Sequence, residues 1–164
     1  MKVLGVDPGT HRMGWGFIEG DARNFSSFRF GVIKPDRGGK LPDRLAFIYR
    51  EIKKIIGEFS PDVVSCEDPF FFKDARAALN LGRAWAAAAI AASEKKIPFE
   101  TYSPLEIKKS TAGYGRASKE QVAAQVKRLL RIKDEVPADA ADALACAFCY
   151  LTDSRNYSGG ALAK

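Results

Sequence analysis

The order of the apolar segments constrains the fold of this chain more than any other feature. Three segments of strand character come first, at 2–7, 12–19 and 25–33, and a turn-rich stretch separates the second from the third. A helical pattern at 41–59 then leads into a β-branched strand at 62–67. This order predicts an α/β domain with a five-stranded mixed sheet flanked by helices, because a helix between two strands allows them to run parallel.

The rest of the chain is expected to be mainly helical, with one more strand at 97–102. Ser103, Ser118 and Pro137 are typical of helix starts and precede three helical patterns. Before that strand, an Ala-rich helix at 75–95 is apolar nearly all round, which indicates burial on more than one side. Its outer side would contact a second subunit, with Trp85 as the anchor, or a third layer of the same chain.

Length and hydropathy set the domain organisation. The chain has 164 residues, of which 46% are hydrophobic, enough for one core and too few for two. We expect one domain over 1–153 and a flexible tail over 154–164. No apolar run is long enough to cross a membrane, and Asp7 interrupts the first apolar run too early for a signal peptide, so a cytoplasmic location is expected.

The charge balance favours a polyanionic partner such as nucleic acid. The net charge is +6, and basic residues concentrate between 108 and 133, although a solvated helix face is the alternative interpretation. The cysteines at 66, 146 and 149 lack a second pair or a nearby histidine that would complete a zinc site. They are expected to be small buried hydrophobes.

Carboxylates end two of the predicted strands, in GVDPG and DVVSCE. If these strands are parallel neighbours, Asp7 and Glu67 project from the same edge of the sheet, which is where sites form in such folds. Turn chemistry is the alternative explanation for Asp7, because Pro8 and Gly9 break the strand directly after it. The sole histidine, His11, follows in the same stretch and is expected to be a turn residue.

Two more acids, Asp139 and Asp142, lie three residues apart on the last predicted helix and therefore share a face. A first-turn position would by itself explain Asp139, whereas Asp142 falls where a packed face would carry an apolar residue. Carboxylates about 4 Å apart repel by roughly 4 kcal/mol at an effective dielectric of 20. The acids are therefore apart, protonated or bound to a divalent cation, and oxygen-only ligands suit Mg²⁺ or Mn²⁺.

The motifs GVDPG, GYGRASKEQV and DAADALA, together with a glutamate that ends a strand, resemble RuvC-type Holliday junction resolvases in order and spacing. The resemblance extends to about residue 150. It implies an RNase H-like fold, a homodimer, and metal-dependent paired nicks in a four-way DNA junction during recombination and repair, leaving 5′-phosphate and 3′-hydroxyl ends. It also implies branch-migration partners of the RuvA and RuvB type.

The same resemblance assigns residues to roles. Two Mg²⁺ ions, or Mn²⁺, would be held at the catalytic acids Asp7, Glu67, Asp139 and Asp142. A phenylalanine of the loop after Glu67 would stack on a base at the junction centre: Phe70 matches this position, and Phe71 is a substitute because the loop departs from the commonest family form. The basic DNA contacts are Lys108 and Lys119 near the scissile phosphate, with Lys109, Arg76 and Arg116 as further phosphate contacts.

Two other classes share parts of this pattern. Another RNase H-like nuclease, acting on a different branched DNA or RNA, is the main alternative. The phosphate-binding ATPases of the actin, hexokinase and Hsp70 superfamily also end a strand with DxGT. They require a duplicated domain and a second glycine-rich phosphate loop, and this sequence has no such repeat.

Overall fold

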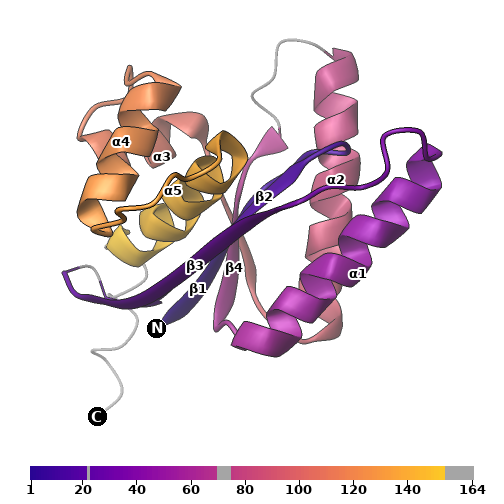
Figure 1. Cartoon of the computed structure of the whole chain (residues 1–164), viewed down its shortest axis with the longest axis horizontal. Helices are drawn as coiled ribbons and strands as arrows, with labels where there is room; N and C mark the ends of the chain where they lie inside the picture. Colours follow the sequence, from indigo (N-terminus) through magenta and orange to yellow (C-terminus); the bar gives the residue numbers. More distant parts are fainter. Residues whose placement is uncertain (22, 70–74, 154–164) are drawn as a thin grey trace.

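The computed structural model, which describes residues 1–21, 23–69 and 75–153, contains one mixed sheet (Figure 1). Its strand order is β3-β2-β1-β4-β5, with β1 antiparallel to β2 and parallel to β4. The five-stranded mixed sheet expected from the sequence is confirmed. The strands are β1 (Lys2–Asp7), β2 (Met13–Gly20), β3 (Phe25–Ile33), β4 (Val63–Glu67) and β5 (Phe99–Tyr102).

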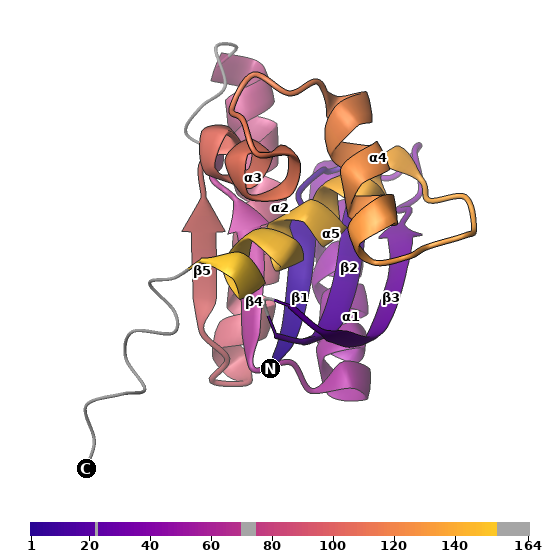
Figure 2. The same cartoon turned by 90° about the vertical axis from the view of Figure 1, so that its left-hand side faces the viewer.

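Helices cover both faces of the sheet. In Figures 1 and 2, α1 and α2 lie on one face, and α3, α4 and α5 lie on the other. The helix starts expected at Ser103 and Ser118 are confirmed, because each serine side chain accepts a hydrogen bond from the backbone three residues ahead in a complete capping box. The helices are α1 (Leu41–Phe59), α2 (Ala75–Glu94), α3 (Pro104–Ala112), α4 (Lys119–Leu129) and α5 (Ala138–Thr152).

Strand alternation separates two hydrophobic cores. Leu4 and Val6 of β1 pack with α1 and α2, whereas Val3 packs with α5 on the other face. The three cysteines are buried and free, as expected for small core residues. None of the helices in the described residues is long and apolar enough to span a bilayer.

Glycines let α5 lie directly on the sheet. A Cβ atom on Gly5 would lie 1.9 Å from the carbonyl oxygen of Ala143, and one on Gly14 would lie 1.8 Å from that of Asp139. Only residues without a side chain permit this approach. Ser65 of β4 adds a tether, because its hydroxyl donates a 2.8 Å hydrogen bond to the carbonyl oxygen of Cys146. Helix α5 therefore crosses the strands with its first turns at the carboxyl end of β1 (Figure 2).

Trp85, the expected anchor of a second-subunit contact on α2, is partly buried, and its role in a dimer stays a prediction. Trp85 packs within the chain, edge to face with Phe99 of β5 at 5.1 Å between ring centroids. This contact packs the indole ring against the core on the α1 and α2 side of the sheet, with the side chain partly buried. The large apolar side chains that α2 exposes are Leu79 and Ile90, which are 56% and 55% exposed. The tail expected over 154–164 lies outside the described residues.

Candidate active site

The strand register places Asp7 and Glu67 on the same face of the sheet. Asp7 pairs with Gly14, and it follows Val3 and Gly5 at alternate positions, both of which face α5. Glu67 follows Ser65 by two residues, and the Ser65 side chain bonds α5. Since side chains two residues apart in a strand share a face, both carboxylates point toward α5 at the carboxyl edge of β1 and β4.

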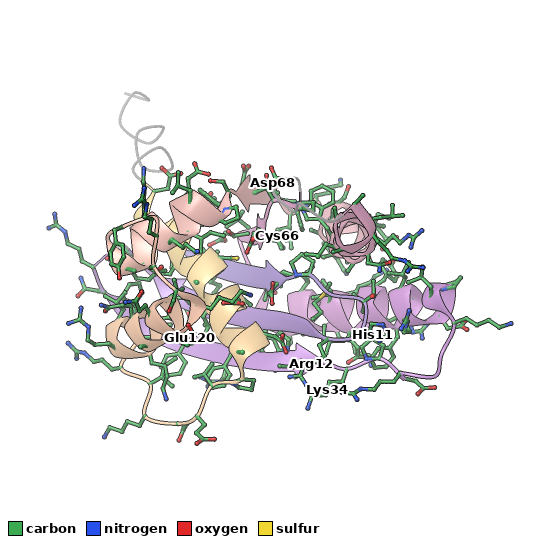
Figure 3. The ribbon with its side chains drawn as sticks, turned by 90° about the horizontal axis from the view of Figure 1, so that it is seen from above. His11, Arg12, Lys34, Cys66, Asp68 and Glu120 are labelled. Atoms are coloured by element: carbon green, nitrogen blue, oxygen red, sulfur yellow. The ribbon has the colours of Figure 1, made fainter. Side chains whose placement is uncertain are left out.

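A cavity of about 190 Å³ lies at this edge and collects side chains from distant parts of the chain. Asp7 and Glu67 form its base, and Asp142 of α5 faces them. Helices α3 and α4 close the other side. Figure 3 looks down on this edge and shows the end of β4, labelled by Cys66 and Asp68, beside the helices of that face. The full lining is Asp7, Glu67, Pro104, Ile107, Lys108, Lys119, Val122 and Asp142.

Burial of like charges dominates the electrostatics of this cavity. Burial raises the pKa of Asp7 from its ordinary value of 3.8 to about 8, with further contributions from the nearby charges of Asp142 and Glu67. The pKa of Glu67 is also raised, mainly by burial, and Lys119 and Lys108 oppose this shift. Among the described residues, no turn N–H donates a hydrogen bond to the Asp7 carboxylate, so turn chemistry does not explain this residue.

Two cations pair with the acids of α5. The Lys119 Nζ lies 2.9 Å from the Asp142 Oδ2, and this contact raises the pKa of Lys119. The Arg12 Nε lies 2.6 Å from the Asp139 Oδ2, so Asp139 is turned toward the β1–β2 turn and does not line the cavity. The sequence analysis did not identify Arg12 as part of the site. Its position shortly after GVDPG could have suggested it, but its partner Asp139 is 127 residues away in the chain.

The donor set fits a divalent cation. Asp7, Glu67 and Asp142 offer only carboxylate oxygens, the ligands that Mg²⁺ and Mn²⁺ prefer. A cation in the cavity would favour the ionised form of the buried Asp7 carboxyl group. As they stand, no three acidic, histidine or cysteine side chains of the described residues are placed to hold a metal ion. Instead, Lys119 pairs with Asp142 and Arg12 pairs with Asp139.

Of the predicted basic DNA contacts, only Lys108 and Lys119 line the cavity. Lys109 is exposed on α3, and Arg116 is exposed between α3 and α4. Arg76 is exposed in the first turn of α2. Phe70 and Phe71 lie outside the described residues. His11 is exposed between β1 and β2, as expected of a turn residue, and contacts Arg44.

Residues 3–150 match the family model described as crossover junction endodeoxyribonuclease RuvC. The chain belongs to the RuvC family. It is 38% identical over 156 residues to the RuvC of Finegoldia magna, covering 94% of this chain and 95% of that relative. It is 41% identical over 156 residues to the RuvC of Thermotoga petrophila, covering 94% of each.

Among solved structures, the chain is similar to T. thermophilus RuvC in complex with a Holliday junction substrate. The TM-score is 0.88 at 30% identity, and the match covers 96% of each chain. The RNase H-like fold implied by the sequence resemblance is therefore confirmed, and so is membership of a family of endonucleases. Within this RuvC family member, the cavity at the end of β1 and β4 is the candidate active site.

Proposed function

We propose that this protein is a metal-dependent endonuclease that resolves four-way (Holliday) DNA junctions in recombination and repair by paired, symmetric nicks. The observation that carries the proposal is the convergence of Asp7, Glu67 and Asp142 in one cavity beside Lys108 and Lys119. This arrangement occurs in a chain similar over nearly its whole length to a RuvC solved with its junction substrate. Carboxylates with adjacent ammonium groups suit hydrolysis of a phosphodiester.

In this proposal the four acids bind two Mg²⁺ ions, for which Mn²⁺ is a substitute. Such ions supply Lewis-acid stabilisation of the phosphate and a nucleophilic water at neutral pH. Asp7, Glu67 and Asp142 already face one cavity, and Asp139 would join them by giving up its contact with Arg12. The products carry 5′-phosphate and 3′-hydroxyl ends.

The lysines have a second role in the proposed reaction. Lys119 neutralises Asp142 in the absence of a divalent ion. A divalent cation held by Asp142 would free the Lys119 ammonium group to contact a phosphate oxygen. Lys108 of α3 lines the same cavity as Lys119 of α4 and holds the same phosphate. Both side chains orient the substrate and stabilise negative charge that develops on the phosphate oxygens.

Paired nicks require two equivalent sites, and we propose that α2 mediates a homodimer. Its outer side exposes Leu79 and Ile90, and these residues line hollows of about 520 and 460 Å³ that meet at Arg83 and Ala86. A second copy of the same helix would cover this apolar surface, and twofold symmetry matches that of the junction.

The remaining assignments follow from family resemblance and are proposals of the same kind. Phe70, or Phe71 in its place, stacks on a base at the junction centre. Arg76, Lys109 and Arg116, which are exposed, contact phosphates of the arms. Branch-migration proteins of the RuvA and RuvB type deliver the junction, and the reaction takes place in the cytoplasm.

The test is cleavage of matched four-way, three-way and linear DNA substrates in Mg²⁺. We expect symmetric nicks in the four-way junction only. Glu67→Gln should abolish nicking while junction binding persists. Glu58→Gln removes an exposed carboxylate far from the cavity and should leave nicking unchanged. Preferential cleavage of the three-way substrate would favour the alternative nuclease, and an active Glu67→Gln variant would refute the site.

A further inference from the structure

The edge of the sheet that carries the candidate active site continues past β1 to the end of β3. Strands β1 and β3 both run antiparallel to β2, so they end at the same edge. The register pairs Met13 with Ile33, which places Lys34 beside the turn that holds Arg12. Figure 3 shows His11, Arg12 and Lys34 together at this edge. Two strand spacings separate β3 from β1, a distance of about 10 Å.

Four basic residues gather here on the β3–α1 connection and the first turn of α1, and we name this surface the β3 flank. Its loop is folded by Asp36, whose carboxylate accepts a 3.1 Å hydrogen bond from the Gly38 N–H and whose carbonyl accepts one of 3.2 Å from the Gly39 N–H. The β3 flank consists of Lys34, Arg37, Lys40 and Arg44.

Arg44 is the fixed member of the β3 flank. Its Nη1 lies 2.9 Å from each ring nitrogen of His11, which joins α1 to the β1–β2 turn. Its Nε is buried and has no hydrogen-bond acceptor among the described residues. The other three side chains, Lys34, Arg37 and Lys40, are exposed.

The β3 flank carries more positive charge than the acids near it offset. Within the described parts of the chain, none of its four side chains forms an ion pair. The two nearby acids have other roles, because Asp36 caps its own loop and Asp43 lies in the first turn of α1, where the helix dipole favours a negative charge. A cluster of unpaired cations beside a candidate phosphodiester site calls for a polyanion.

We propose that the β3 flank binds backbone phosphates of the DNA arm that leaves the active site on the side away from Lys108 and Lys119. The inference rests on the proposed function and adds a second cationic surface, so that the substrate backbone crosses the sheet edge between two groups of basic residues. Each strand of a duplex carries a phosphate about every 3.4 Å along the axis. The distance from Asp7 to Lys34 therefore corresponds to about three nucleotides from the scissile phosphate.

The test measures junction binding against salt concentration in EDTA, where no nicking occurs. The variants are Lys34→Gln and the double variant Lys34→Gln/Arg37→Gln. Lys95→Gln is the control, since it removes one exposed charge after α2, away from the β3–α1 connection. One phosphate contact contributes about 0.9 to the slope of log K against log salt. We expect Lys34→Gln to lower this slope by about 0.9 and to weaken binding about eightfold at 0.1 M salt.

The double variant should lose about twice as much slope, and hydroxyl-radical footprinting should show protection lost about three nucleotides from the cut. Lys95→Gln should match the wild type. If the wild-type protein prefers the four-way junction but the β3-flank variants keep its slope and footprint, this inference is wrong and the proposed function stands. In that case an acidic protein is the better partner for the surface. If the wild type does not distinguish four-way from linear DNA, the proposed function itself fails.

Discussion

Replacing Asp7 by asparagine should stabilise the metal-free protein while abolishing nicking. Asp7 is held at the base of the cavity with Glu67 and Asp142, and its pKa rises to about 8, chiefly through burial. A carboxyl group with a raised pKa binds more protons in the folded state than in the unfolded state. The penalty to folding stability is therefore absent below the ordinary pKa of 3.8. It grows as the pH rises toward 8, because the carboxyl group ionises in the unfolded chain before it ionises in the folded one.

The structure sets the size of this effect. Each pH unit between the ordinary pKa of 3.8 and the working pH adds about 1.4 kcal/mol to the cost. At pH 7 the cost approaches about 4 kcal/mol, and at pH 5 it is about 1–2 kcal/mol. Water entry and side-chain relaxation reduce both figures, so we expect Asp7→Asn to raise the free energy of unfolding by about 2–4 kcal/mol at pH 7.

The assay is urea unfolding of both proteins in EDTA at pH 5 and pH 7, repeated with Mg²⁺. The advantage of Asp7→Asn should grow with pH in EDTA and shrink in Mg²⁺, since a bound cation stabilises only the wild type by mass action. Asp21→Asn provides a control of opposite sign. The Asp21 carboxylate accepts hydrogen bonds from the Arg23 and Asn24 N–H groups, which lower its pKa. Destabilisation by Asp7→Asn at pH 7 would contradict an unfavourable burial of the Asp7 carboxylate and support the turn interpretation.

Four further substitutions test the remaining steps. Gly5→Ala should cost about 3 kcal/mol or more in urea unfolding, because its Cβ would lie 1.9 Å from a carbonyl oxygen of α5; near-wild-type stability would contradict the direct contact of α5 with the sheet. Ser65→Ala should cost about 1 kcal/mol by the same measurement through loss of its buried hydrogen bond, and no loss would show that the tether is unimportant. Lys119→Gln should tighten Mg²⁺ binding measured by calorimetry, because Asp142 loses its ammonium partner. The same variant should slow nicking at saturating Mg²⁺ about tenfold or more. Unchanged Mg²⁺ binding would show that Lys119 and Mg²⁺ do not compete for Asp142. Phe70→Ala should slow cleavage more than it weakens junction binding, with a loss of about 1–3 kcal/mol, and an unchanged rate would assign the stacking role to Phe71.

The sequence predicted the fold well because its signals are local. The helix caps at Ser103 and Ser118, the strand that ends at Glu67 and the amphipathic pattern of α1 each depend on a few neighbouring residues. The element bounds accordingly differ from expectation by only a residue or two at most ends. The strand expected at 97–102 begins at Phe99, because the Ile97 N–H bonds back to Ala92 at the end of α2.

By itself, the sequence determined the order of helices and strands, the carboxylates that end β1 and β4, and the pair of acids on α5. Only the tertiary structure decided which of those acids meet. Asp142 faces Asp7 and Glu67, while Asp139 pairs with Arg12. It also decided that Trp85 contacts Phe99 of the same chain and that the β3 flank lies at the same edge as the cavity. The reason is physical: capping and periodicity act within a few residues, whereas strand register and helix packing set distances between groups far apart in the chain.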